Sequence, residues 1–280
     1  MSNERNGPAA FCLSRRSLLA ATVLVGLAGS RASAGSPVPD RQGGISGIKA
    51  MVFDIQGTVV DYYSPLVEIG NEINQRNDLT ADWGKVAQDW VAEVSKGIGA
   101  VIAGRQAWQP VGQIFRVALE EVLKRQGLAE RISDADRSEL LSVWVKMRSW
   151  PDSAPGITRL KQRYTVAALS SGSMAGVIRV AKAGNLPFDA ILTGELAKAY
   201  KPMPDVYRLA VDYLGFRADE IMMVACHKWD LKGAKAAGLR TAFVPRSAEI
   251  GILTKLDTAS ESYIDVIAAD LVDLASKLNA

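Results

Sequence analysis

Short, continuous apolar runs alternate with longer segments of helical periodicity along much of this chain. The short runs are typical of buried strands, and they occupy residues 48–53, 164–169, 190–192, 221–225 and 241–244. Helical spacing of apolar residues separates the later runs, over 173–183, 203–213 and 229–237. This alternation predicts an α/β fold built on a doubly wound, parallel, Rossmann-like sheet.

The long block between the first two strands, residues 64–150, has a different pattern. Apolar residues such as Val86, Trp90 and Val94 recur there at helical spacing, and no strand pattern interrupts them. Ser133 followed by Asp134 is typical of a helix start. The expected helices span 66–77, 81–97, 110–127 and 134–148. We therefore expect an inserted helical cap over the carboxyl ends of the strands, with a core formed by residues 48–63 and 151–280.

The N-terminus has the three parts of an export signal in the right order. Arg15 and Arg16 form a twin-arginine pattern, an apolar segment follows over 18–28, and Ala32-Ser33-Ala34 is a small-x-small cleavage site. We expect residues 1–34 to be a twin-arginine signal peptide and 35–47 a linker. The apolar segment is too short for a stable membrane span. The sequence thus predicts a periplasmic or secreted protein with no stable membrane span after cleavage.

Cleavage also changes what charge and cysteine content imply. The first 34 residues carry four arginines against one glutamate, a net +3, which equals the net charge of the whole chain. The mature protein is therefore close to neutral, so charge gives no indication of a nucleic-acid partner. Cys12 leaves with the signal and Cys226 remains alone, which excludes an intrachain disulfide in the mature protein. A homodimer is one assembly that the sequence allows.

Polar residues follow four of the elements expected at one edge of the sheet. In open α/β sheets ligands bind in the crevice at the carboxyl ends of the strands, so these residues are expected to converge there. Taken singly, each also has a structural interpretation: Ser170 could cap a helix and Asp230 could favour a helix N-terminus. Their order along the chain is the stronger indication of a site. The set comprises Asp54, Thr58, Ser170, Ser171, Lys201, Tyr207, His227 and Asp230.

These residues lie in phrases that resemble the haloacid dehalogenase superfamily, and most closely its type II (L-2-haloacid) dehalogenases. The phrases are Phe53-Asp54-x-x-Gly57-Thr58, Leu169-Ser170-Ser171-Gly172-Ser173, Tyr200-Lys201-Pro202-x-Pro204-x-x-Tyr207, Trp229-Asp230-x-x-Gly233-Ala234-x-x-x-Gly238 and Pro151-Asp152-x-x-Pro155-Gly156. The resemblance spans roughly residues 48–250. It implies a hydrolase that removes halogen from small 2-haloacids, with a small-molecule substrate, no cofactor and no metal.

The resemblance also implies roles. Asp54 would be the nucleophile, and Thr58 and Ser170 would hydrogen-bond its carboxylate or that of the substrate. Lys201 would pair with Asp54 and Asp230. Ser171 would occupy a position where the family usually has Asn, and Tyr207 would anchor the network. A lysine ammonium nearby keeps an aspartate ionised, which lets it expel halide and form an ester that water then hydrolyses.

His227 is the only histidine in the chain. It is either an idle loop residue or the base that activates the hydrolytic water, because an imidazole pKa near 6.5 suits proton transfer around neutral pH. If the side chain of Lys228 is close to the ring, it would lower that pKa and keep the ring neutral.

Two alternatives stay open at this point. A magnesium-dependent phosphatase of the same superfamily usually has acids where this chain has Gln56 and Cys226, so the chain lacks usual acid/base and metal-ligand groups. An exported, non-catalytic anion-binding member is favoured by Gln56, where the dehalogenases typically have an aromatic residue, and by the loss of their cap Trp-Arg pair. Trp83 is followed here by Gly84, and Trp90 by Val91. Bases that could replace the arginine are Lys85, Arg105 and Arg116.

Overall fold

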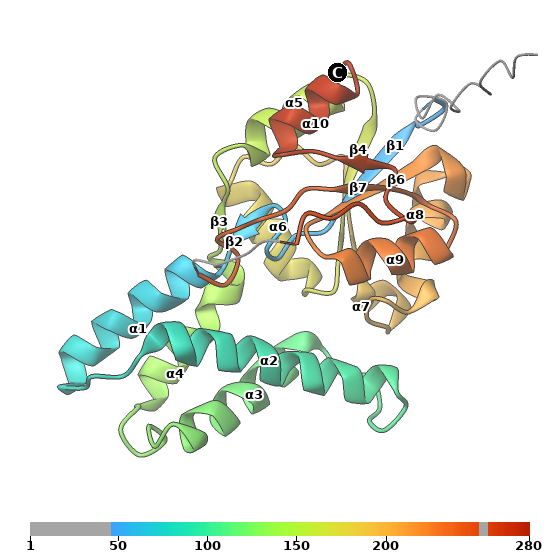
Figure 1. Cartoon of the computed structure of the whole chain (residues 1–280). Coiled ribbons are helices and arrows are strands. Elements are labelled where there is room, and N and C mark those ends of the chain that lie inside the picture. The colour runs from blue at the N-terminus through green and yellow to red at the C-terminus, as the bar shows by residue number, and fades with distance from the viewer. Residues whose placement is uncertain (1–45, 252–256) are drawn as a thin grey trace, which may run out of the picture. The chain divides into compact units, whose positions relative to one another are not determined.

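Six parallel strands form the central sheet of the computed structural model, which describes residues 46–251 and 257–280 (Figure 1). The strand order is β5-β4-β1-β6-β7-β8, and every neighbouring pair is parallel. The fold class expected from the sequence is therefore confirmed. The strands are β1 (Ala50–Phe53), β4 (Thr165–Ser170), β5 (Ala190–Thr193), β6 (Ile221–Ala225), β7 (Arg240–Phe243) and β8 (Val266–Ile267).

Helices cover both faces of this sheet, which explains the continuous apolar runs of its strands. Residues of β1 alternate between two apolar clusters, since Met51 and Phe53 belong to one and Ala50 and Val52 to the other. The first cluster is completed by α5 (Ser153–Lys161), α6 (Met174–Ala183) and α10 (Leu271–Lys277), and the second by α8 (Pro204–Leu214) and α9 (Lys228–Ala236). β1, at the centre of the sheet, is fully buried.

The cap segment folds into helices whose buried apolar residues form one cluster with the face of the sheet that carries Met51 and Phe53. Its helices are α1 (Tyr63–Asn77), α2 (Trp83–Ile102), α3 (Val111–Arg125) and α4 (Asp134–Ser142). The indole of Trp90 donates a hydrogen bond to the Phe115 carbonyl at 2.9 Å, which ties α2 to α3. Trp144 stacks on the Phe115 ring with a centroid separation of 4.1 Å. The helix start expected at Ser133 is confirmed, because Ser133 and Asp136 form a reciprocal capping box.

One expected helix, 134–148, is wrong in its second half. The helix α4 ends at Ser142, a 3-10 turn follows over Val143–Val145, and β3 (Arg148–Ser149) pairs antiparallel with β2 (Val60–Asp61). A strand therefore interrupts the block that was expected to contain none. The helix ends early because of a tertiary contact, in which Trp144 leaves the helical path and stacks on Phe115. The paired strands β2 and β3 hold together the two places where the chain enters and leaves the cap.

Short elements escaped the sequence pattern altogether. They are α5, α7 (Gly194–Ala197), a 3-10 turn at Ala218–Glu220, β8 and α10. Other boundaries moved by a few residues, and α2 continues to Ile102 instead of ending at 97. The predicted signal peptide, and all but the last two residues of the predicted linker, lie outside the described residues. Within the described ranges, no helix combines the length and hydropathy needed to cross a bilayer.

Candidate active site

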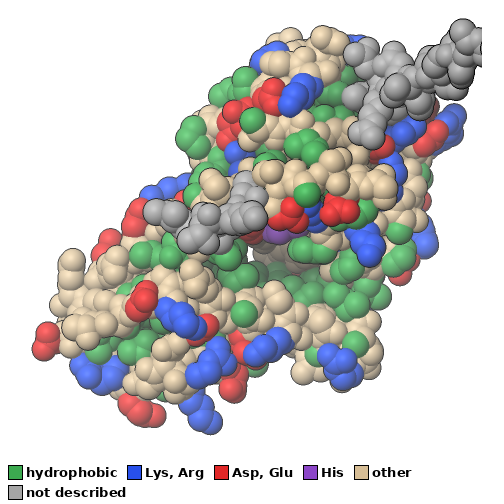
Figure 2. Space-filling view, in the orientation of Figure 1, with side chains coloured by type: hydrophobic (Ala, Val, Ile, Leu, Met, Phe, Trp, Pro, Cys, Tyr) green, Lys and Arg blue, Asp and Glu red, His purple; other side chains and the backbone are tan. Residues whose placement is uncertain are grey.

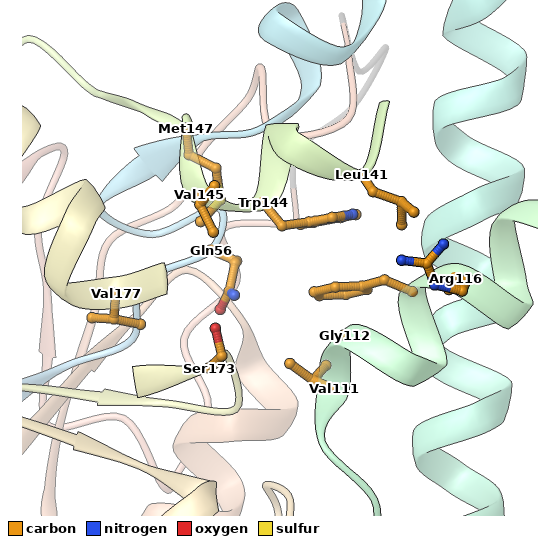
Figure 3. A pocket seen from close by; sticks show the side chains of 11 residues that line it. Gln56, Val111, Gly112, Arg116, Leu141, Trp144, Val145, Met147, Ser173 and Val177 are labelled. Atoms are coloured by element: carbon orange, nitrogen blue, oxygen red, sulfur yellow. The ribbon is translucent and has the colours of Figure 1, made fainter. Parts of the chain in front are cut away.

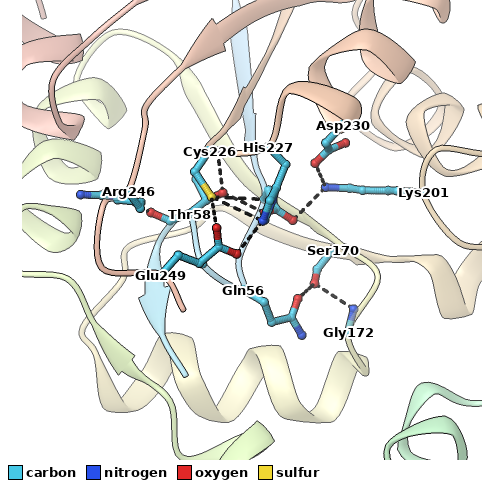
Figure 4. Close-up of polar contacts among 12 residues, drawn as sticks. Gln56, Thr58, Ser170, Gly172, Lys201, Cys226, His227, Asp230, Arg246 and Glu249 are labelled. Atoms are coloured by element: carbon cyan, nitrogen blue, oxygen red, sulfur yellow. Dashed lines mark hydrogen bonds and ion pairs between the residues drawn. The ribbon is translucent and has the colours of Figure 1, made fainter. Parts of the chain in front are cut away.

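All eight predicted site residues lie at the carboxyl edge of the sheet and are joined by hydrogen bonds into neighbouring groups. Figure 4 shows five of them, Thr58, Ser170, Lys201, His227 and Asp230. The elements explain why. Asp54 directly follows β1, Ser170 ends β4, and His227 precedes α9, which carries Asp230 in its first turn. Because β1 lies between β4 and β6, the ends of these three strands are adjacent.

Asp54 is a buried carboxylate held by two basic groups and a hydroxyl. Lys201 Nζ lies 3.1 Å from its Oδ1, Thr58 donates to Oδ2 at 2.8 Å, and His227 Nδ1 lies 3.1 Å from Oδ2. Burial by itself raises the pKa of Asp54, but Lys201, His227 and Thr58 outweigh it and hold the pKa of this carboxyl well below its ordinary value. Asp54 is therefore an ionised group with a free oxygen lone pair, as a nucleophile requires.

Lys201 is shared between two carboxylates. Its ammonium lies 2.7 Å from Asp230 Oδ2, and Tyr207 donates to Asp230 Oδ1 at 2.8 Å. Burial would lower the pKa of Lys201, but Asp230 and Asp54 raise it above its ordinary value. Burial raises the pKa of Asp230, opposed by Lys201 and reinforced by Asp54. The lysine is thus fixed in its charged form, and Tyr207 and Asp230 fix its position.

The two serines bind the surrounding backbone and Gln56. Ser170 Oγ donates to Gln56 Oε1 at 3.0 Å and accepts from the Gly172 N–H at 2.9 Å. Ser171 Oγ accepts from the Lys201 N–H at 3.2 Å. The helix-capping alternative for Ser170 is wrong, because Ser173 caps α6. Of the two hydroxyls expected near Asp54, only Thr58 has a hydrogen bond to it among the described contacts.

His227 bridges two carboxylates. Its Nδ1 faces Asp54, and its Nε2 lies 2.7 Å from Glu249 Oε1. Burial would lower the pKa of His227, but the Cys226 sulfur and the Asp54 and Glu249 carboxylates raise it well above its ordinary value. The expectation that Lys228 keeps this ring neutral is wrong. Lys228 turns away and pairs with Asp257 at 2.7 Å, and the two carboxylates that face the ring favour its imidazolium form.

Comparison with known proteins identifies the family to which the chain belongs. A family model for haloacid dehalogenase-like hydrolases matches residues 48–238. The chain is 30% identical over 207 residues to (S)-2-haloacid dehalogenase 1 of Pseudomonas sp. (strain CBS-3), covering 71% of this chain and 85% of that protein. This chain belongs to the haloacid dehalogenase-like hydrolase family.

Solved structures of this family superpose well on the chain. One is an L-2-haloacid dehalogenase with a TM-score of 0.77 and 36% identity, covering 83% of this chain and 99% of the other. Another is a defluorinating L-2-haloacid dehalogenase with a TM-score of 0.78 and 32% identity, covering 83% of this chain and 96% of the other. Both the fold and the sequence of this family member are thus similar to those of hydrolases that act on carbon–halogen bonds.

Glu249 is the site residue that sequence reasoning missed. It lies in the loop after β7, outside every phrase that carries the family resemblance. Its carboxylate packs against Gly57, which has a φ of +82° and where a Cβ atom would collide with the Glu249 side chain. Its position after a strand end was the one available signal, but no neighbouring motif distinguished it from other loop acids.

The donor atoms of this family member do not match a magnesium site. Magnesium prefers near-octahedral oxygen ligands, and both Asp230 oxygens already accept hydrogen bonds, from Lys201 and Tyr207. Cys226, His227 and Glu249 are the one group of three potential metal ligands found among the described residues. Both ring nitrogens of His227 are, however, already in hydrogen-bond contact with carboxylates.

A cavity of about 500 Å³ opens in front of Asp54, between the strand ends and α2. Figure 2 shows the histidine at the rim of this hollow, with hydrophobic side chains below it. A smaller cavity of about 200 Å³ adjoins it and shares Gln56, Phe115 and Trp144 with it (Figure 3). Arg116 lies on the far side of this smaller cavity, across from Gln56 and Ser173.

Two cap tryptophans and one of the expected substitute bases are used elsewhere. The Trp83 indole donates to Asn74 at 2.9 Å, and the Trp90 indole donates to a carbonyl within the cap, so neither offers a donor to a halide. Lys85 pairs with Asp89. Of the three bases considered as replacements for the family's arginine, Arg116 alone lines either of these two cavities.

Proposed function

We propose that this chain is a hydrolytic dehalogenase that acts on 2-haloacids through an ester of Asp54. The observation that carries the proposal is Asp54 itself, which faces the cavity and is kept ionised by Lys201 although it is buried. Relatives over most of the chain are named (S)-2-haloacid dehalogenases, which supports the same substrate class.

In the first step, an Asp54 oxygen attacks C2 of the substrate. A carbon–oxygen bond forms, the carbon–halogen bond breaks, and the halide leaves with the bonding electrons. Lys201 stays paired with Asp230 throughout, so the ammonium remains in place when Asp54 loses its charge. The product of this step is a neutral ester on a side chain that was an anion.

In the second step, water attacks the carbonyl carbon of the Asp54 ester. Backbone N–H groups at the strand end can stabilise the oxyanion, an effect worth about 2.7–4 kcal/mol per donor. Collapse releases a 2-hydroxyacid and one proton and restores the carboxylate. Asp54 thus gains one oxygen from water. The hydroxyl oxygen of the product is the Asp54 oxygen that attacked C2 in the first step.

His227 is the proposed proton acceptor for this water. The resting imidazolium cannot accept a proton, but ester formation removes the negative charge of Asp54 next to Nδ1. The pKa of the ring then falls, and Nδ1 can release its proton and become an acceptor. Glu249 holds the other nitrogen as an N–H donor at 2.7 Å and so fixes the tautomer.

The test is halide release from the separate enantiomers of 2-chloropropanoate, with and without EDTA, beside a panel of phosphoesters with magnesium. We expect chloride release that survives EDTA. Magnesium-dependent phosphate release without chloride would assign the protein to the phosphatase branch instead.

A single turnover in H₂¹⁸O with enzyme in excess tests the ester directly. The first product should carry an unlabelled hydroxyl, and the label should appear in the peptide that contains Asp54. Label in the first product would indicate direct attack by water and contradict the ester.

A further inference from the structure

The cavity in front of Asp54 is mostly apolar, and its apolar wall comes from one face of α2. Val91, Val94, Ile98 and Ile102 recur at helical spacing and all line the cavity. Phe115 and Trp144 extend this wall. The cavity volume of about 500 Å³ lies within the roughly 300–1,000 Å³ of typical small-molecule sites, so a three-carbon acid would fill little of it.

The rim of the cavity is apolar as well. Trp229 lines it from the sheet side and is 51% exposed, a fraction that only Val117 and Tyr213 exceed among the described large hydrophobic side chains. Its ring lies 5.5 Å from the His227 ring. A large indole left open to solvent at a cavity mouth is suited to contact with an apolar ligand.

The charged groups at the base of the cavity have no cation to spare for a substrate carboxylate. Lys201 is divided between Asp54 and Asp230, and His227 between Asp54 and Glu249. Among the described residues that line this cavity, none is an arginine, and Arg116 lines only the smaller cavity beside it. Three carboxyl groups therefore surround two basic groups, and an acid that enters gains little from ion pairing.

We propose that this site prefers 2-haloacids with a long apolar chain, whose tail packs against the α2 face while C2 meets Asp54. This inference rests on the proposed function and names its substrate class. The physical reason is that apolar burial must supply the binding free energy that a free cation does not. Burial of each methylene then raises kcat/KM by roughly fourfold, or about 60-fold from a three-carbon to a six-carbon acid.

Gly99 offers a way to test where the tail lies. It lines the cavity on α2, and a Cβ atom there would meet nothing within 4 Å, so a larger side chain projects into the cavity without a clash at its base. Ala92 on the same helix is the control, because it is exposed and lines neither this cavity nor the smaller one beside it.

The experiment compares kcat/KM for 2-bromopropanoate and 2-bromohexanoate, which share one leaving group. We expect the longer acid to be favoured about 60-fold in the wild type and in Ala92→Leu. In Gly99→Leu the ratio should fall at least tenfold. Equal rates for both acids in the wild type, or an unchanged ratio in Gly99→Leu, would overturn the proposal.

Binding of unreactive acids separates this inference from the dehalogenase activity. Hexanoate should bind more tightly than propanoate by calorimetry in the wild type, whether or not any haloacid is turned over, and this difference should shrink in Gly99→Leu. Halide release without a chain-length preference would refute the inference alone. Selective hexanoate binding without halide release from any haloacid would refute the proposed function alone.

Discussion

Asp54 is buried and yet ionised in the free protein, because its neighbours hold its pKa low. Isolated burial would favour the protonated acid, but Lys201 and His227 each place a basic group within 3.1 Å of one of its oxygens. Thr58 adds a hydrogen bond that also fixes the carboxylate plane. The proposed nucleophile is thus ionised before any substrate binds, and removal of its charge should stop the proposed reaction at the first step.

We expect Asp54→Asn to abolish halide release while the protein stays folded. An amide oxygen is a far weaker nucleophile than a carboxylate. Halide release and circular dichroism measure the two effects, and mass spectrometry excludes hydrolysis of the amide back to Asp. Asp61→Asn is the matched control, because Asp61 is also buried but contacts the Ser64 N–H at 3.0 Å. Normal turnover by the Asp54→Asn variant would refute the assignment.

His227 should matter after the ester has formed. We expect His227→Ala to accumulate a covalent adduct on the peptide that carries Asp54, because displacement needs only the carboxylate whereas hydrolysis needs a proton acceptor. Loss of a general base typically slows a step by about 10²–10⁴-fold, so mass spectrometry after a single turnover should detect the adduct. Lys228→Ala is the control and should behave as wild type. Unchanged burst and steady-state rates in His227→Ala would make this ring an idle loop residue.

The same imidazolium makes stability depend on pH. The pKa of His227 is raised in the folded protein above its ordinary 6.5. Its contribution to stability is therefore complete below pH about 6.5 and is lost as the pH rises through the folded pKa. Relative to the wild type, His227→Gln should lower Tm most in mild acid and progressively less in alkali. Thermal melts from mild acid to alkali measure these differences in Tm. An equal loss of Tm at every pH would contradict the ion pairs of His227 with Asp54 and Glu249.

At the scale of elements, sequence pattern was sufficient where a segment is long or continuously apolar. β1 and β6 are fully buried strands, and their apolar runs alone indicated them. The pattern failed at β2, β3 and β8, because strands of two residues have no periodicity to detect. It also failed at Val143–Val145, where the stacking of Trp144 on Phe115 outweighs local helical preference.

The site residues also divide into those that the sequence predicted and those that it missed. Asp54, Lys201 and Asp230 were found because each lies in a recognisable phrase at the edge of the sheet, and the sheet order brings them together. Glu249 was missed, and with it the charge state of His227, because the pairing joins two loops distant in sequence. A sequence neighbour, Lys228, was given an influence that its side chain does not exert.

The contact between α5 and α10 explains the glycine in the Pro155-Gly156 phrase. A Cβ at Gly156 would lie 2.6 Å from the Leu271 backbone carbon, and backbone cannot easily move aside. We expect Gly156→Ala to destabilise the protein by about 1–3 kcal/mol. Gly112→Ala should instead be slightly stabilising, because a Cβ atom there meets open space in the first turn of α3. Urea unfolding measures both, and equal stability of the two variants would contradict this explanation.

At the scale of the whole molecule, hydrogen bonds fix the chain crossings at the base of the cap to the core. The Trp150 indole donates to the Gly57 carbonyl at 2.9 Å, and Ser153 donates to the Val59 carbonyl at 2.7 Å. Arg246 links the same region through two bonds of 2.8 Å to Asp152, which also accepts from the Leu271 N–H. The base of the cap, the loop after β7 and α10 are therefore fixed to one another beside the site. Such a network is formed only in the folded protein.

We propose that the protein is exported in this folded state by the twin-arginine route. The reasons are the order of arginine pair, apolar segment and cleavage site in residues 1–34, together with a single cysteine, Cys226, in the mature chain. Replacement of Arg15 and Arg16 by lysine keeps the charge but removes the guanidinium pair, and we expect it to leave the protein in the cytoplasm uncleaved. Cell fractionation and the mass of the accumulated protein measure this, with Arg5→Lys as the matched control. Export and cleavage of the double-lysine variant to the same extent as the control would show that the pair does not direct the protein to this route.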